Sequence, residues 1–151
     1  MSDIQVTVTG DKEFVRKLRA FTSGPMDLKR SLSASGLYLT NFFSGEVFAS
    51  RGRVIGKPWP RLNESYATWK ARMFPGRPPL IRSGEMQRSF FSKASAQRLE
   101  LGNRADHFQF HQEGMGVPQR MLMRVDEQRA ARVAKYIIGD LAEQMQKAGL
   151  V

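Results

Sequence analysis

The chain has 151 residues, of which 41% are hydrophobic and 25% charged, with ten Phe, three Tyr and two Trp. This composition predicts one folded domain spanning residues 1–151 and excludes a disordered chain. There is no cysteine, which excludes disulfides, thiolate metal sites and a cysteine nucleophile. With no signal-peptide pattern and no run of about 18 apolar residues, we expect a soluble protein that is not secreted and has no membrane contact.

The N-terminal third predicts one strand and two helices. Residues 4–10 alternate apolar with polar, the pattern of a half-buried strand. Asp11 is expected to cap a short helix that ends near Thr22. After a Ser-Gly-Pro break, apolar residues at helical spacing predict a long amphipathic helix over 25–49. Gly36 lies inside this helix, and we expect another backbone to pack closely against it.

The middle of the chain is broken by glycine and proline. Residues 50–60 predict a basic loop, because their glycines and prolines cannot continue a helix. Asn63 is expected to cap a short helix over 63–73, which the proline-rich residues 75–79 end. A short helical stretch is predicted over 83–91.

The C-terminal half predicts short strands and one long helix. The predicted strands are residues 92–96, 98–102, 107–111 and 121–124, and they are expected to pair as an antiparallel sheet with the N-terminal strand. Asp126 should cap a final helix that stops before Gly149. We therefore predict an α+β fold, in which a small antiparallel sheet packs against two principal long helices and extended Gly/Pro-rich arms project from it.

Most of the net charge of +10 lies in one third of the chain. Residues 51–104 hold twelve Lys and Arg against three acidic residues, a net charge of +9. Such a field attracts polyanions, either nucleic acid or an acidic protein surface, although it can also serve solubility alone. The candidates in this basic segment are Arg51, Arg53, Arg72, Arg82 and Arg88.

The two histidines, His107 and His111, are the first candidates for metal binding. In the predicted strand over 107–111 they share one face, but residues four apart on a strand are about 13 Å apart and cannot share one zinc ion. Only a helix would bring them together. The two phenylalanines between them favour the strand, so we expect no metal site.

No motif for catalysis or nucleotide binding is present. The sequence lacks a Gly-x-Ser-x-Gly frame, a P-loop and a dinucleotide-binding Gly-x-Gly-x-x-Gly, and its acidic residues are scattered. We therefore predict no catalytic residues, no cofactor and no small-molecule substrate, and expect that the protein is not an enzyme.

Trp59 lies between two prolines in the basic loop and has two interpretations. An exposed tryptophan there would be a good interface anchor. A tryptophan that packs its loop onto the domain is the more common arrangement, and the sequence favours it.

Several blocks of the sequence resemble the phage virion-morphogenesis family, which includes Mu-type and related tail-completion proteins. The helix ending Phe48–Ser50, followed by Gly56–Leu62 with its Lys-Pro-Trp-Pro core and then by Lys70, is similar to the opening motif of that family. The blocks Leu80–Ser89 and His107–Gly114 match its next two elements.

A fourth block, Val117–Leu122, matches a proline–arginine element of the family, and the four blocks keep the family's order over residues 40–125. The chain departs from the family pattern at Ser83, Phe108 and Met121, which replace Thr, Ala and Pro. No departure removes a catalytic group, because the resemblance implies none.

The resemblance implies a small α+β neck-type fold and a structural role in a tailed phage or prophage. It implies a homo-oligomeric ring, a hexamer or dodecamer, at the head–tail junction of the virion, assembled in the host bacterial cytoplasm. Its partners would be the neighbouring connector, neck and tail proteins, with non-specific contact to genomic DNA in the lumen. The residues expected to carry assembly contacts are Lys57, Trp59, Arg61, Arg77, Pro78, His111 and Arg120.

Three extended segments support an assembly role from the residues alone. Residues 51–61, 75–79 and 113–118 are rich in glycine or proline, and such arms suit contacts in which unlike patches of neighbouring subunits close a ring. The alternative is a basic DNA-binding accessory protein in phage packaging or regulation. That alternative needs a recognition helix with base-reading side chains, and no predicted helix concentrates them.

Overall fold

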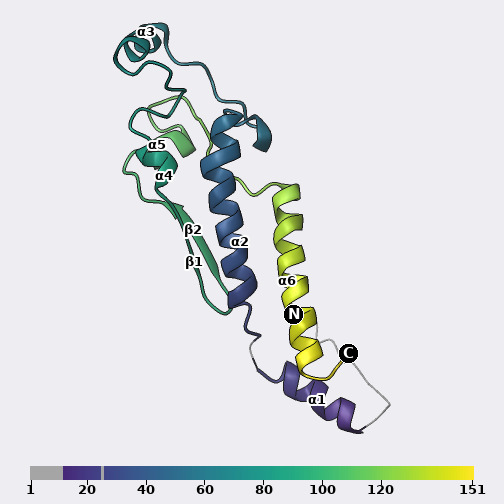
Figure 1. The fold of residues 1–151 in the computed structure, drawn as a ribbon. Helices are drawn as coiled ribbons and strands as arrows, with labels where there is room; N and C mark the ends of the chain where they lie inside the picture. Colours follow the sequence, from purple (N-terminus) through teal and green to yellow (C-terminus); the bar gives the residue numbers. More distant parts are fainter. Residues whose placement is uncertain (1–11, 25) are drawn as a thin grey trace.

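A computed structural model describes residues 12–24 and 26–151. The molecule is elongated: two long helices, α2 and α6, lie side by side, a β hairpin lies along the other side of α2, and α3 and α1 lie at opposite ends (Figure 1). The elements are α1 (Lys12–Thr22), α2 (Lys29–Phe42), η1 (Phe43–Val47), η2 (Arg53–Ile55), α3 (Glu64–Met73), α4 (Glu85–Arg88), β1 (Phe90–Ala94), β2 (Leu99–Asn103), α5 (Phe108–Glu113) and α6 (Glu127–Lys147).

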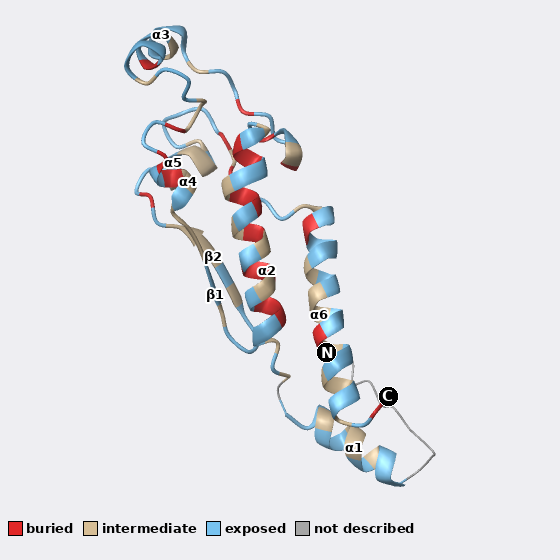
Figure 2. Ribbon diagram, viewed as in Figure 1, coloured by how far each residue is buried: buried red, intermediate tan, exposed pale blue. Residues whose placement is uncertain are grey.

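Helix α2 forms the centre of the core, and the buried residues follow one side of it (Figure 2). Its last turn widens into the π-helical segment η1, after which the helical path continues to Ala49. The predicted long helix is therefore confirmed, although it begins at Lys29. Gly36 lies against β1, where an added Cβ would be 2.7 Å from the Cβ of Ser92. Close packing at this glycine is confirmed, but the nearest atoms belong to the side chains of Ser92 and Leu99 rather than to a backbone.

The hairpin β1–β2 is antiparallel, with Phe90 opposite Asn103 and Ala94 opposite Leu99. Two strands alone are marginally stable in water, so the sheet depends on the helix beneath it. Phe90 supplies that contact: its ring packs against Phe43, with 5.8 Å between the ring centroids, and against Phe48 and Phe108. This aromatic cluster joins the helical path that continues α2 through η1, the hairpin and α5.

Helix α6 begins where the sequence predicts. The carboxylate of Asp126 accepts a hydrogen bond from the backbone N–H of Arg129 at 3.0 Å, which is an N-cap contact. The Arg129 guanidinium lies 4.0 Å from the ring centroid of Phe42 on α2. Further along, the buried Asp140 pairs with Arg30 at 3.1 Å and accepts from the backbone N–H of Ser31. These contacts fix α6 on α2 at two points along its length.

The α+β class, with a small antiparallel sheet and two long helices, is confirmed. The helices predicted after Asp11 and after Asn63 are present, and the side chain of Asn63 caps α3 by accepting from the N–H of Ser65. The strands expected over 92–96 and 98–102 are present, each shifted by one or two residues. The strand expected over 4–10 lies outside the described residues.

The prediction of a strand over 107–111 is wrong, because this segment forms the short helix α5. The two phenylalanines there do not share a buried face: Phe108 packs on Phe90, whereas Phe110 is exposed. Gly114 ends the helix in the left-handed region at φ +74°, a conformation that glycine adopts without strain. The packing of Phe108 against the hairpin favours the helix over the strand that the alternating pattern predicts.

The strand expected over 121–124 is also not present, because side chains take the place of a partner strand. The Oε1 of Gln112 accepts from the backbone N–H groups of Leu122 and Met123, and its Nε2 donates to the carbonyl of Met123. The helix expected over 83–91 is reduced to α4, because Phe90 already belongs to β1. Along the described chain, no helix combines the length and the apolar character needed to cross a bilayer.

Candidate functional site

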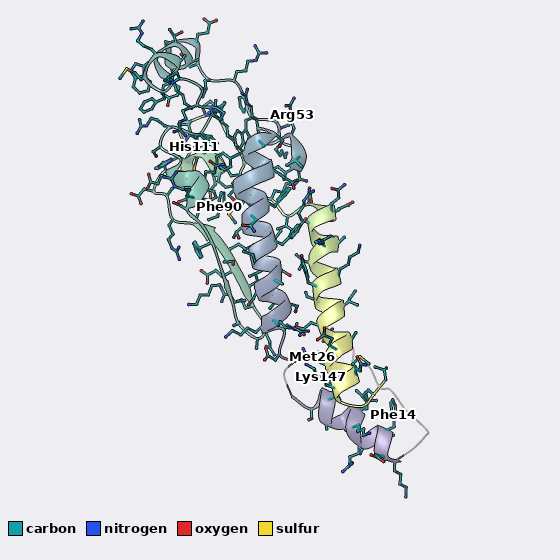
Figure 3. All side chains as sticks on the ribbon, in the orientation of Figure 1. Phe14, Met26, Arg53, Phe90, His111 and Lys147 are labelled. Carbon is teal, nitrogen blue, oxygen red and sulfur yellow. The ribbon has the colours of Figure 1, made fainter. Side chains whose placement is uncertain are left out.

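The end of the molecule near α3 is built from loops rather than from regular secondary structure. Residues 50–61, the segment between α3 and α4, helix α5 and residues 114–124 meet there, and Figure 3 shows His111 among the side chains of this region. Backbone N–H and C=O groups in loops lack the regular partners of helices and strands, so they need other hydrogen-bond partners where they are buried. Long side chains supply those partners here.

Trp59 fastens the basic loop to the core. Its indole is 9% exposed, packs edge-on against Phe48 and donates from Nε1 to the carbonyl oxygen of Met121 at 2.8 Å. Gly52 lies directly against it at φ +80°, and an added Cβ there would collide with the indole and with the carbonyl of Lys57. The interpretation of Trp59 as an anchor for its own loop is confirmed.

Arg120 holds the same loop from the other side. Its side chain is buried, and its guanidinium donates to the carbonyls of Pro60 and Arg61, both at 3.0 Å. Its backbone N–H donates to the carbonyl of His111 on α5. One arginine thus ties three segments that are far apart in the sequence.

Lys70 links helix α3 to the proline-rich segment that follows it. We call the helix and this segment together the arm. The side chain of Lys70 is 3% exposed, and its ammonium donates to the carbonyl of Pro78 at 2.5 Å. Burial, together with the positive charges of Arg120 and Arg82, lowers the pKa of Lys70. Within residues 12–24 and 26–151, neither Lys70 nor Arg120 forms an ion pair with a carboxylate.

The histidines are close together because α5 is a helix. Their ring centroids are 6.2 Å apart, so the separation expected for a strand does not apply. Burial, and then the charges of Arg120 and His107, lowers the pKa of His111, whose Nδ1 is buried and has no hydrogen-bond partner among the described residues. Within the described chain, no group of three or more histidine or acidic side chains is placed to hold a metal ion.

A cavity of about 440 Å³ lies between α3, α4, α5 and the loop that follows α5. The charged and titratable side chains that line it are Lys70, Arg82, Glu85, His107, His111 and Arg120. Its apolar lining comes from Leu62, Tyr66, Leu80, Met86, Val117 and Pro118. The cavity therefore combines a cationic lining with apolar walls, a combination that suits an anionic group attached to an apolar one.

The structure separates the predicted assembly residues into three groups by burial. Lys57, Arg61 and Arg77 are exposed, whereas Trp59 and Arg120 are buried within their own chain. His111 and Pro78 are partly buried. The predicted basic residues are all exposed: Arg51, Arg53, Arg72, Arg82 and Arg88. Only Arg82 of these lines the cavity.

Three residues of this end were missing from the sequence-based candidates. Gln112 pairs with the backbone of 122–123, Lys70 carries a buried charge, and Tyr66 lines the cavity. A lysine and a glutamine on short helices usually face solvent, so neither residue type signals burial. The only available signal was the placement of Lys70 and Gln112 within the family-like blocks.

No protein-family model, curated protein or solved structure matches this chain. Its function is therefore inferred from its residues and their geometry.

Proposed function

We propose that this chain is a structural virion protein of a tailed phage or prophage: a ring-forming head–tail neck or tail-completion subunit that acts in virion assembly and genome passage. In this proposal it is not an enzyme and uses no cofactor or small-molecule substrate. The observation that carries the proposal is the convergence of the four family-like sequence blocks at one end of the molecule. At that end, side chains from the blocks donate or accept hydrogen bonds with the backbones of other segments, and we call these contacts structural braces.

Each block contributes one brace. Trp59 from the first block bonds to Met121 in the last, Gln112 from the third holds 122–123, and Arg120 returns to Pro60 and Arg61 in the first. The second block contributes Gln87, whose Nε2 donates to the carbonyl of Ser44 at 2.8 Å. A signature made of braces rather than reacting groups is what a structural family would retain, and this supports the proposal.

The α3 arm supports an assembly role, because it presents aromatic side chains to solvent. Tyr66 and Trp69 are stacked with 5.6 Å between ring centroids, and both remain more than 40% exposed. Met73 on the same helix is also exposed. Exposed tryptophan and tyrosine are the residue types most enriched among interface hot spots. The arm extends beyond the end of α2 (Figure 1).

Apolar side chains are also exposed on the two long helices. Leu37 on α2 and Ile138 on α6 are 62% and 65% exposed. Two unlike surfaces on one subunit permit a heterologous contact, in which the arm of one copy meets the helices of the next and rotation closes a ring. A ring of this kind at the head–tail junction would contact the adjoining connector, neck and tail proteins.

The exposed arginines are suited to contact a negatively charged surface, which in this proposal is either genomic DNA or an acidic partner ring. Arg51 and Arg53 follow the end of the central helix, and Arg72 lies on α3. In a neck ring such residues would face the passing DNA or an acidic partner ring, and both contacts weaken as salt increases.

The alternative, a basic DNA-binding accessory protein, is supported less well. Helix α3 is the longest helix in the basic segment, but its Lys70 is buried, and its exposed side includes Tyr66, Trp69 and Met73. A recognition helix would present arginine, asparagine or glutamine to base edges instead.

The test is the oligomeric state of the purified protein, measured by light scattering over a concentration series and by negative-stain electron microscopy. Closed rings with weak affinity for duplex DNA at physiological salt are expected. A monomer or dimer that binds duplex DNA tightly at the same salt would contradict the proposal and favour the accessory protein.

A further inference from the structure

The cavity beneath α3 has more positive charge than residues 12–24 and 26–151 neutralise. Lys70 and Arg120 are 3% and 5% exposed, and Arg82 stands at the same lining. Their hydrogen bonds run to backbone carbonyls, at Pro78 for Lys70 and at Pro60 and Arg61 for Arg120. A carbonyl satisfies a donor but supplies only a partial charge, so the buried positive charge remains uncompensated.

Only one carboxylate lines the cavity among the described residues, that of Glu85, and it forms no ion pair with these cations. The cavity can therefore take up a further negative charge. His111 contributes an unpartnered ring nitrogen rather than a charge, because its Nδ1 is buried at the same lining with no partner from the described chain. An incoming anion would find charged donors from Lys70 and Arg120 in a partly desolvated space, where charge-assisted bonds are strong.

The walls specify the rest of the ligand. Leu62, Leu80, Met86 and Val117 give the cavity a mainly apolar surface, and Tyr66 of α3 adds an aromatic side chain to the lining. Duplex DNA fits such a space poorly, because its phosphates lie on a stiff, broad and convex surface that exposed arginines reach more easily than an enclosed lysine does. A side chain from an extended protein segment fits better.

We propose that this cavity binds a glutamate or aspartate side chain, flanked by an apolar residue, from an extended segment of a neighbouring protein in the assembly. The proposal rests on the proposed function, and it deepens it by naming the chemistry of the partner at this end of the subunit. Lys70 and Arg120 receive the carboxylate, Arg82 guides it from the surface, and the apolar walls hold the neighbouring residue.

The test uses the full-length protein and two short capped peptides, Ala-Leu-Glu-Leu-Ala and Ala-Leu-Gln-Leu-Ala, titrated in ¹⁵N-edited NMR spectra at neutral pH. The glutamate peptide is expected to shift the amide signals of α3, α4 and residues 114–122, with an affinity at least about tenfold above that of the glutamine peptide. Equal affinity of the two peptides, or no binding of either, would overturn the proposal.

Two charge variants at the cavity mouth should change the affinity for the glutamate peptide in opposite directions. Neither variant removes a structural brace. Arg82→Gln should weaken the glutamate peptide several-fold, because it removes a guiding cation. Glu85→Gln should strengthen it, because it removes the competing carboxylate. Arg98→Gln, an exposed residue in the hairpin turn, is the matched control and should leave the affinity unchanged. Lys70→Met should abolish the preference for glutamate, with circular dichroism confirming that the variant is folded.

Two further outcomes separate this proposal from the proposed function. Displacement of the peptide by a short DNA duplex, through the same amide signals, would assign the cavity to nucleic acid and overturn the peptide site. Closed rings formed by a protein that binds neither peptide would refute the carboxylate site and leave the proposed function intact. Peptide binding by a protein that never forms rings would do the reverse.

Discussion

The loop 50–61 and the arm 62–79 are neighbours in the sequence with similar composition, but the fold uses them in opposite ways. Each contains a tryptophan, a Gly/Pro-rich stretch and several basic residues. Trp59 of the loop is buried and hydrogen-bonded to Met121, whereas Trp69 of the arm is 43% exposed and contacts Tyr66 and Phe74 of the arm itself.

The difference between the two regions lies in what their backbones can reach. The loop follows directly from the central helix, so its carbonyls lie within range of Arg120 and Arg124, which donate to Pro60, Arg61 and Ile55. The arm is held mainly through Lys70 and Pro78, a contact within the arm. The loop therefore contributes to the stability of the subunit, and the arm keeps its aromatic side chains exposed.

The largest expected difference between the two regions is in the tryptophans. Trp59→Ala should lower the free energy of unfolding by about 3–5 kcal/mol, because it empties a core site and leaves the Met121 carbonyl without its donor. Trp69→Ala should cost about 1 kcal/mol or less, the value of an exposed aromatic pair. Urea denaturation followed by circular dichroism measures both. Equal losses would remove the distinction between loop and arm.

A matched pair of glycines gives the next largest difference. Gly52 and Gly76 both have positive φ, +80° and +74°, but Gly52 is enclosed by Lys57 and Trp59, and Gly76 has no atom within 4 Å of an added Cβ. Gly76→Ala should cost about 1 kcal/mol, from backbone strain alone. Gly52→Ala should cost at least about 2 kcal/mol more, because overpacking adds to the strain. Thermal unfolding of the two variants at one pH compares them directly, and a larger loss at Gly76 would contradict the account.

The smallest expected effect is a dependence of folding stability on pH. It arises from His111, at the junction of the two regions. Burial and nearby positive charge lower its pKa below 6.5 in the folded state, so the neutral ring favours folding. Its contribution is fully present above the unfolded pKa and is lost as the pH falls through the lower folded-state pKa. Stability should therefore decrease on acidification from pH 7 toward pH 5, and His111→Gln should reduce that decrease.

The control for this pH effect is His107→Gln, which changes the exposed ring of the pair. It should retain most of the acid dependence. An unchanged acid dependence in His111→Gln would show that other groups cause it.

Much of the fold could be predicted from local signals. Asn63 and Asp126 cap helices where a side-chain oxygen precedes an apolar pattern, and Gly36 marks a close approach of β1. These features depend on a few neighbouring residues or on one missing side chain, so the sequence displays them directly.

The errors arose where a distant partner decides the local structure. The alternation over 107–111 predicts a strand, but Phe108 meets Phe90 of the hairpin, and this contact is satisfied by a helix. Residues 121–124 have strand-like composition, but the amide of Gln112 takes the hydrogen bonds that a partner strand would have made. The burial of Lys70 and Arg120 likewise depends on loop carbonyls, which no sequence pattern locates.

Particle mass shows whether the arm is an assembly surface while the loop is a structural brace. Light scattering of the wild type and of the double variant Tyr66→Ala/Trp69→Ala, at matched concentrations, compares their oligomeric states. We predict closed rings for the wild type and folded monomers for the double variant. Rings of unchanged mass in the double variant would contradict the role of the arm, and a wild type that remains a DNA-bound monomer would contradict the assembly function itself.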